Sequence, residues 1–190
     1  MDVATLTFTI DDGVYLRPVK HGDIGEVLRA VQENYDHLRA FMEWAKPDYA
    51  LSDAEDWVTR SVDGARLSKQ LNFVIMRRDR LIGTIGFAAI DHEAKVTEIG
   101  YWIDRKEEGK GITSRACHFL LELAFAEMGM NRVQIRCASG NARSAAIPKR
   151  FGFKKEGVQR QHVKRDGHIY DFWIFGLLKA EWETMQNAIN

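Results

Sequence analysis

Hydrophobic positions along the chain follow two spacings, and together these predict a protein of mixed strands and helices. Alternating or short apolar runs predict strands over residues 14–18, 73–76, 81–90, 97–103, 132–137, 158–165 and 169–178. Apolar residues three and four apart predict helices over 20–44, with a break at Asn34 or Asp36, and over 113–128. Antiparallel strand runs with one strand–helix–strand stretch indicate a mixed α/β sheet, in a single domain over residues 1–190.

Local signals mark where several of these elements begin and end. Ser52 precedes Glu55 by three residues, a capping-box spacing that predicts the start of a helix. Gly129 stands at a stop position after the helix over 113–128. Asp166 and Gly167 form a dipeptide typical of a hairpin turn, so the last two strands should pair with each other.

Composition narrows the class of protein. Hydrophobic residues make up 45% and charged residues 28%, and 27 basic residues balance 27 acidic ones. This balance gives no global attraction to nucleic acid or to a membrane, and no stretch approaches the ~20 apolar residues needed to span one. Because residues 1–11 do not resemble a signal peptide, we expect a cytoplasmic protein. Cys117 and Cys137 read as small buried hydrophobes, and the histidines lack the spacing of metal ligands.

The most informative stretch is a strand, a glycine loop and a helix in that order. The strand over 97–103 leads to Gly109-Lys-Gly-Ile112, and the helix follows directly. The first N–H groups of a helix have no intrahelical partners and favour an anion, most readily a phosphate. A full Gly-x-Gly-x-x-Gly or Gly-Lys-Ser/Thr motif is missing here, which argues against a site for NAD or ATP.

Three motifs in order resemble the Gcn5-related N-acetyltransferases, in the branch that acetylates the N-termini of ribosomal proteins. They are Glu98-Ile-Gly-Tyr-Trp-Ile103, Gly109-Lys-Gly-Ile112, and Asn141-Ala-Arg-Ser144 followed by Gly152-Phe153. The resemblance covers nearly the whole chain. It implies the fold of this family: a mixed, mostly antiparallel sheet that is splayed at the cofactor site and flanked by helices.

The resemblance also implies which residues hold acetyl-CoA, the expected co-substrate. The pyrophosphate would lie on the loop, and the pantetheine arm along the splayed strand and the residue that begins the next helix. The implied set is Gly109, Lys110, Gly111 and Ile112 for the pyrophosphate, and Tyr101, Trp102, Ile103 and Asn141 for the arm. The family carries Arg or Gln at the start of the loop, where this chain has Lys106.

Ser144 is the expected proton donor to the departing sulfur. Most of the superfamily uses a tyrosine seven residues after the asparagine, but that position here is Pro148, which also interrupts the short helix predicted over 141–150. The ribosomal branch lacks this tyrosine too and is thought to use the serine. Two plainer roles compete: a helix N-cap for Asn141, and a surface position for Ser144.

Glu98 is the expected general base, because an acidic residue inside an apolar strand needs a partner or a function. A structural salt bridge is the competing explanation. Some members of the ribosomal branch place a glutamate where this chain has Val163, so His162, His168 or Tyr170 are alternative bases. A protein α-amino group titrates near ~8, so a dedicated base is not essential.

The acceptor is an amine, and the resemblance favours a protein N-terminus in an extended groove. Polyamines, antibiotics and aminoacyl nucleotides are the small-molecule alternatives, and a CoA-binding sensor without turnover is another. Direct binding to nucleic acid or a membrane is not expected, and a homodimer is compatible with the sequence. The resemblance implies that the N-terminal helices and the hairpin around Asp166-Gly167 form the rim of the groove, with helix packing as the competing role for the helix residues. Its apolar and polar candidates are Asn34, Tyr35, Leu38, Phe41, Met42 and Trp44, and its acidic ones Glu33, Asp36, Glu43 and Asp48.

Overall fold

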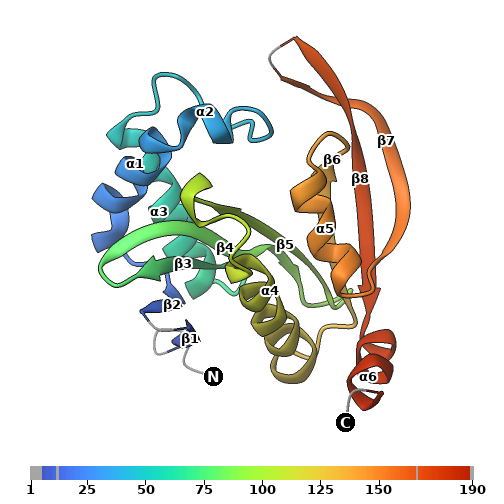
Figure 1. The fold of residues 1–190 in the computed structure, drawn as a ribbon. Coiled ribbons are helices and arrows are strands. Elements are labelled where there is room, and N and C mark those ends of the chain that lie inside the picture. The colour runs from blue at the N-terminus through green and yellow to red at the C-terminus, as the bar shows by residue number, and fades with distance from the viewer. Residues whose placement is uncertain (1–5, 12, 166, 189–190) are drawn as a thin grey trace.

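The computed structural model describes residues 6–11, 13–165 and 167–188. Its strands form one eight-stranded sheet in the order β1-β2-β3-β4-β5-β6-β8-β7 (Figure 1). Neighbouring strands are antiparallel except β5 and β6, which are parallel. This confirms the predicted mixed and mostly antiparallel sheet. The strands are β1 (Phe8–Asp11), β2 (Val14–Pro18), β3 (Leu71–Arg77), β4 (Arg80–Asp91), β5 (Val96–Ile103), β6 (Arg132–Ala138), β7 (Lys154–Arg165) and β8 (His168–Leu178).

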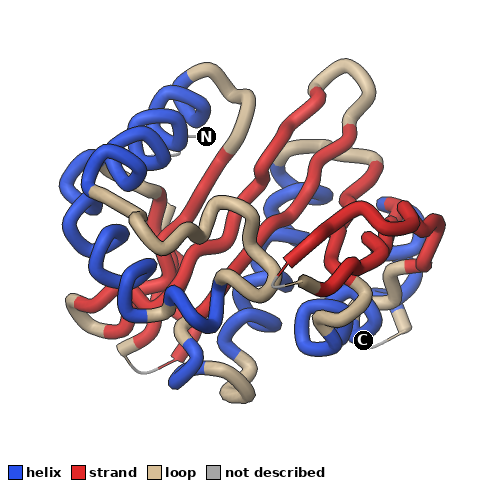
Figure 2. Tube along the Cα trace, turned by 90° about the horizontal axis from the view of Figure 1, so that it is seen from above, coloured by secondary structure: helices blue, strands red, loops and turns tan. Residues whose placement is uncertain are grey.

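Helices lie on both sides of the strands (Figure 2). The alternation of β5 shows why the sheet forms the middle layer, since Ile99 belongs to one core cluster and Trp102 to the other. The first cluster includes side chains of α4, α5 and α6, and the second those of α1, α2 and α3. The helices are α1 (Ile24–Glu33), α2 (Tyr35–Leu38), α3 (Leu51–Arg66), α4 (Ile112–Glu122), α5 (Ala142–Arg150) and α6 (Lys179–Asn187).

β5 and β6 pair only over their first residues. Their register runs from Val96↔Arg132 to Glu98↔Gln134, whereas β4 stays paired with β5 as far as Ile103. Past Glu98 the two parallel strands diverge, and the two halves of the sheet separate (Figure 1). Within the described chain, residues 100–103 of β5 therefore have no ladder partner in β6, which leaves backbone groups on that edge for a ligand.

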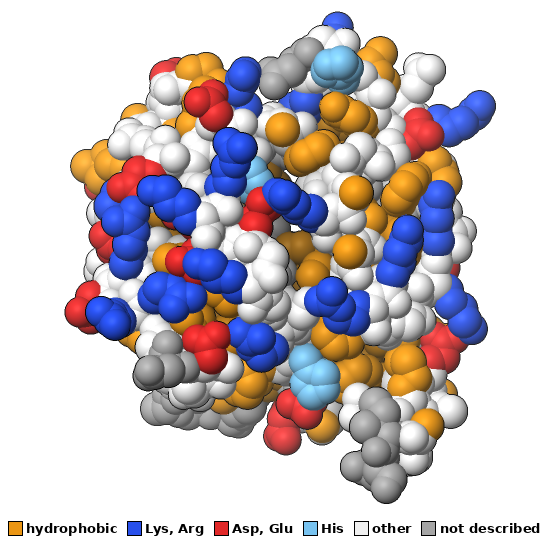
Figure 3. Space-filling view, in the orientation of Figure 1, with side chains coloured by type: hydrophobic (Ala, Val, Ile, Leu, Met, Phe, Trp, Pro, Cys, Tyr) orange, Lys and Arg blue, Asp and Glu red, His pale blue; other side chains and the backbone are white. Residues whose placement is uncertain are grey.

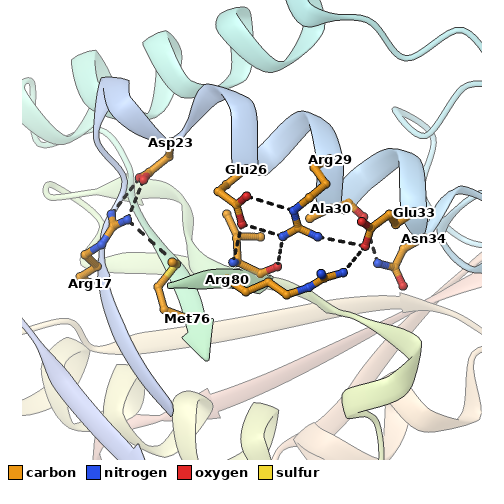
Figure 4. A network of polar contacts seen from close by, with 10 residues as sticks. Arg17, Asp23, Glu26, Arg29, Ala30, Glu33, Asn34, Met76 and Arg80 are labelled. Atoms are coloured by element: carbon orange, nitrogen blue, oxygen red, sulfur yellow. Dashed lines mark hydrogen bonds and ion pairs between the residues drawn. The ribbon is translucent and has the colours of Figure 1, made fainter. Parts of the chain in front are cut away.

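The break between α1 and α2 joins the first helices to the loop after β5. Arg29 donates to the carboxylates of Glu26 and Glu33 on α1 (Figure 4). Asn34 lies between the two helices, as predicted, and is 5% exposed. Its side-chain Oδ1 accepts a hydrogen bond of 3.1 Å from the backbone N–H of Arg105. The end of α1 is thus tied to the segment that leads into the glycine loop.

The predicted capping box at Ser52 is wrong. Helix α3 begins at Leu51, and the carboxylate of Asp53 accepts a hydrogen bond of 2.9 Å from the backbone N–H of Ala50. Asp53 thus does what was expected of Glu55, two residues earlier in the chain. Both carboxylates are near the start of the helix. Asp53 is the third residue of α3, and Ala54 and Val58 are buried on the face that packs in the core.

Two predictions about helix ends had different outcomes. Pro148 does not interrupt the short helix, because α5 continues through it to Arg150. The proline removes one backbone donor but leaves the helical path intact. After α4, residues 123–127 form a π-helical turn, and Gly129 follows with a φ of +64°. This positive φ confirms Gly129 as the stop.

Two elements were not predicted from the sequence: the outer strand β1, and helix α6, which follows β8. The ring of Phe8 in β1 stacks on Phe119 of α4 at 4.5 Å, and Trp182 of α6 is buried in the core. Asp166 of the predicted turn lies outside the described residues, but β7 and β8 pair up to Arg165↔His168 on either side of it. Among the described residues, no helix is long and apolar enough to cross a membrane.

Candidate active site

A cleft of about 650 Å³ opens where β5 and β6 diverge. In the space-filling view the molecule is hollowed near its centre, with hydrophobic side chains inside and Lys and Arg around the rim (Figure 3). Eight of the ten residues predicted from the sequence line this cleft. They are Tyr101, Trp102, Ile103, Gly109, Gly111, Ile112, Asn141 and Ser144.

The glycine loop forms one end of the cleft. Gly109 and Gly111 both have a φ of +74°, in the left-handed region that glycine adopts without strain. Helix α4 starts directly after Gly111, and the backbone N–H of Arg115 is the one that bonds the Gly111 carbonyl, at 3.1 Å. The amides before Arg115 therefore have no partner within the helix, so they and the helix dipole favour an anion here.

Two of the predicted residues do not line the cleft. The ammonium of Lys110 lies 2.9 Å from a carboxylate oxygen of Glu107, so residue 110 can offer the cleft only its backbone. Glu98 accepts hydrogen bonds from Gln134 Nε2 at 2.8 Å and from Arg136 Nε at 3.0 Å. Glu98 thus forms the structural salt bridge that was its competing role, with Arg136 as the partner.

Asn141 and Ser144 lie on the opposite wall, at the start of α5. The Asn141 Oδ1 accepts a hydrogen bond of 3.0 Å from the backbone N–H of Ser144, so Asn141 is the N-cap of this helix. The cap uses only the oxygen of the amide, and the nitrogen can still donate to a ligand. The Ser144 hydroxyl lies 3.3 Å from the phenol oxygen of Tyr101 on β5. Strand and helix therefore meet at Ser144.

A set of polar and charged side chains in the cleft lining was not predicted from the sequence. The carboxylate of Glu108 pairs with the guanidinium of Arg143 from α5 and lies 3.3 Å from Nε2 of His37 on α2. Arg150, at the C-terminal end of α5, donates to the hydroxyl of Ser114 on α4. All five residues line the cleft. They come from three distant segments, so no local pattern in the sequence could have grouped them.

The acceptor rim, as we define it, joins the loop after α2 to the β7–β8 hairpin. The rings of Phe41 and Tyr170 lie 5.8 Å apart, and Glu43 pairs with Arg165 at 2.6 Å. A Cβ atom at Gly140 would lie 2.4 Å from the Tyr170 ring, so this ring also packs against the β6–α5 connection. The rim therefore ties three segments together beside the cleft.

The residues predicted near the acceptor separate into two groups. Leu38, Phe41, Met42 and Asp36 line the cleft, and the Asp36 side chain is 89% exposed. Trp44 is not part of the lining, and its ring packs 6.3 Å from that of Trp102. Among the other predicted residues, Glu33 and Glu43 are held in ion pairs, and Asn34, Tyr35 and Asp48 lie outside the lining.

The alternative bases lie outside the cleft lining. Val163 is 2% exposed and belongs to the interior. The His162 ring packs against Phe172 at 5.2 Å, and the His168 ring lies 6.1 Å from that of Tyr170. None of these four hairpin residues is part of the described cleft lining.

Both cysteines are free and buried, as the sequence indicated. Burial raises the pKa of Cys117 to about 12 and that of Cys137 to about 11. The thiols therefore stay protonated near neutral pH, and protonated thiols are poor nucleophiles.

Comparisons with known proteins agree with this geometry. Residues 14–154 match the family model described as an acetyltransferase (GNAT) domain. The chain is 31% identical to YdaF of Bacillus subtilis (strain 168) over 180 residues, which covers 93% of this chain and 97% of the relative. It is 29% identical over 162 residues to the ribosomal-protein-serine acetyltransferase of Escherichia coli (strain K12), covering 83% and 88% of the two chains.

A solved structure provides a cofactor comparison. The microcin C7 self-immunity acetyltransferase MccE, in complex with acetyl-CoA and AMP, superposes with a TM-score of 0.80. The two chains are 26% identical, and the match covers 88% of this chain and 93% of that one.

Proposed function

Because the chain belongs to the GNAT acetyltransferase family and is an N-acetyltransferase that uses acetyl-CoA, we propose that its acceptor is the N-terminal α-amino group of a protein. A ribosomal protein is the first candidate, since the Escherichia coli relative acts on one by its name. The observation that carries the proposal is that the anion-binding loop, the free edge of β5 and Ser144 all line the same cleft.

The residues of the cleft fit acetyl-CoA in three places. The amides of residues 109–112 and the start of α4 suit the pyrophosphate. The unpaired edge of β5 over 101–103 offers peptide groups to the amides of the pantetheine arm. The amide nitrogen of Asn141 can donate to a carbonyl of the arm from the other wall.

In the reaction, the neutral amine attacks the carbonyl carbon of the thioester, the new C–N bond forms, and the C–S bond breaks. The amine loses one proton and the CoA thiolate gains one. We assign the donor role to Ser144, which gives its hydroxyl proton to the sulfur. The proton that the amine loses passes to the base and then, through water, restores the hydroxyl of Ser144. Pro148 has no proton to give at the position of the family's tyrosine.

Glu98 remains our proposed base. It lies on the same face of β5 as Gly100, where a Cβ atom would meet nothing within 4 Å, so there is open space next to its position. Glu98 would act through a water molecule, since its carboxylate also accepts from Gln134 and Arg136. The demand on this base is small, because a protein α-amino group titrates near ~8.

An extended peptide suits the acceptor side better than a compact amine. The cleft lining includes the apolar side chains of Leu38, Phe41 and Met42, which suit the first side chains of a peptide. The carboxylate of Asp36, which is 89% exposed and pairs with Arg39 at 3.2 Å, adds an acidic group to this side of the cleft.

A thiol-release assay with acetyl-CoA tests the proposal. The acceptor panel contains N-terminal peptides of ribosomal proteins, the same peptides with blocked α-amino groups, polyamines, aminoglycosides and an aminoacyl nucleotide. We expect turnover on the free peptides and none on the blocked ones. Turnover confined to a small amine would move the function to metabolism or resistance. CoA binding without turnover on any acceptor would favour a sensor.

The same assay over a range of pH tests the base. In Glu98→Gln, we expect a drop in kcat/KM of about 10-fold across the pH range, while the acidic limb set by the α-amino group of the acceptor remains. His37→Gln is the comparison, because His37 lines the cleft but pairs with Glu108. If only His37→Gln lowers kcat/KM, the base is His37 and not Glu98.

A further inference from the structure

Pro148 in helix α5 changes the hydrogen bonding of Ser144, four residues earlier in the helix. In an α-helix the N–H of each residue bonds the carbonyl four positions earlier. Pro148 has no N–H, so the Ser144 carbonyl cannot receive this bond. The residue proposed as proton donor is therefore also the residue whose backbone acceptor is left without its usual helical donor.

Tyr101 of β5 supplies the missing donor. Its phenol O–H donates to the Ser144 carbonyl at 2.9 Å. The Ser144 hydroxyl in turn donates to the same phenol oxygen, at 3.3 Å. One phenol thus holds both the backbone and the side chain of Ser144. The contact crosses the cleft from the strand wall to the helix wall.

The phenol acts as a donor at any ordinary pH. Burial raises the pKa of Tyr101 well above its usual value, although the hydrogen bond from Ser144 lowers it in part. Its proton therefore stays on the oxygen and directed at the carbonyl. The phenol oxygen keeps its lone pairs for the Ser144 hydroxyl, which is thereby held toward the free edge of β5.

We propose that Tyr101 is a positioning residue that orients the Ser144 hydroxyl toward the thioester sulfur, made necessary by Pro148. This proposal rests on the proposed donor role of Ser144. With acetyl-CoA bound, the Ser144 hydroxyl turns its hydrogen from the phenol oxygen to the sulfur, while the bond from the phenol to the Ser144 carbonyl holds the serine in place. Tyr101 gives no proton to the substrate.

A thermal-stability cycle tests the contact without any turnover. Tyr101→Phe removes the hydroxyl and keeps the ring, and leaves the Ser144 carbonyl without a donor, so we expect Tm to fall by about 3–6 °C. Pro148→Ala restores the N–H of position 148. In that background the same Tyr101→Phe change should lower Tm by less than half as much. Equal losses in the two backgrounds would overturn the contact.

A kinetic cycle tests the positioning role. In Tyr101→Phe we expect kcat to fall about 10-fold while KM for acetyl-CoA stays within about 2-fold, because the donor is misplaced and the cofactor contacts remain. The loss should shrink in the Pro148→Ala background together with the stability loss, because the restored N–H then holds the Ser144 carbonyl, and it should vanish in the Ser144→Ala background. Tyr49→Phe, in the other core cluster, is the matched control and should keep its kcat.

The outcomes separate the two proposals. A full kcat loss in the Pro148→Ala background would mean that the bond to the Ser144 carbonyl does not position the hydroxyl, and a loss that persists in the Ser144→Ala background would make Tyr101 a merely structural residue. Either result would overturn the positioning role. A kcat in Ser144→Ala equal to that of the wild type would reject the donor role of Ser144, and the positioning role with it. The Tm cycle would in that case still report whether the phenol holds the Ser144 carbonyl.

Discussion

The cofactor side of the cleft and the acceptor rim are built from different kinds of contact. The cofactor side consists mainly of backbone: the unpaired edge of β5, the two left-handed glycines and the start of α4. The acceptor rim consists of side-chain pairs between distant segments, such as Phe41 with Tyr170 and Glu43 with Arg165. Few residue types other than glycine adopt the left-handed backbone of the loop, whereas many different side chains could replace those of the acceptor rim.

This difference explains how one chemistry can serve many acceptors. A backbone site tolerates little change, because its conformation depends on glycine and on the register of the strands. A rim of exposed side chains can change without loss of the fold, since most surface pairs contribute little to stability. Mutations on the cofactor side should therefore reduce reaction with every acceptor, and mutations in the rim should change which acceptor is preferred.

The largest effect is expected at Ser144. Ser144→Ala removes the proposed donor and should lower kcat by about 100-fold with every acceptor, because the departing sulfur would leave as an unprotonated thiolate. KM for acetyl-CoA should hardly change. The control is Ser52→Ala on the exposed surface of α3. Loss of activity with one acceptor only would place Ser144 on the acceptor side. It would contradict the division of the cleft into a cofactor side and an acceptor rim.

The next effect concerns the glycine loop. Gly109→Ala forces a side chain into a left-handed conformation and should weaken CoA binding about 10-fold by calorimetry, because the amides turn away from the pyrophosphate. Gly167→Ala is a matched control, with a φ of +77° against +74°, and neither site has an atom within 4 Å of the added Cβ. Equal CoA affinities of the two variants would show that the loop does not bind the cofactor.

A smaller effect is expected at Gly140. A Cβ atom there would collide with the Tyr170 ring, so Gly140→Ala should displace the rim and raise KM for the peptide about 5-fold. The affinity for CoA should stay within about 2-fold, since the loop is untouched. The control is Gly157→Ala in β7, which pairs with the strand that carries Tyr170. Its added Cβ would lie at an ordinary 3.7 Å from Ile174. A rise in the Kd of CoA alone would assign Gly140 to the cofactor side.

The smallest effect is expected at the ion pair of the rim. Glu43→Gln removes an exposed partner of Arg165 and should change KM for the peptide by only about 2-fold. The change should shrink further at high salt, because exposed charges are screened. A salt titration of kcat/KM for wild type and variant measures this. An effect above 10-fold that resists salt would mean that Glu43 contacts the acceptor itself.

Predictability from the sequence follows the same division. The anion-binding loop could be predicted from its glycines and the helix that follows, whereas the splayed strand and the pair Asn141 and Ser144 were implied by the resemblance to the family. Glu98 shows the limit, since the alternation of a strand gives a face but not the partner on the next strand, here Gln134 and Arg136. Lys110 was assigned with its loop, but its ammonium turns to Glu107.

What could not be predicted depends on contacts between distant segments. Glu108 meets His37 and Arg143 only after α2, the glycine loop and α5 have been brought together. Pro148 appeared in the sequence as an interruption of the helix. Its structural consequence, the bond from Tyr101 to the Ser144 carbonyl, requires the cleft to exist.

A crystal structure of the protein with bound CoA tests the central claim most directly. We expect the pyrophosphate to lie on the amides of residues 109–112 and the pantetheine arm along β5. The sulfur should lie within about 3.5 Å of the Ser144 hydroxyl. CoA bound outside the gap between β5 and β6, or with its sulfur remote from Ser144, would contradict the assignment of this cleft and its donor.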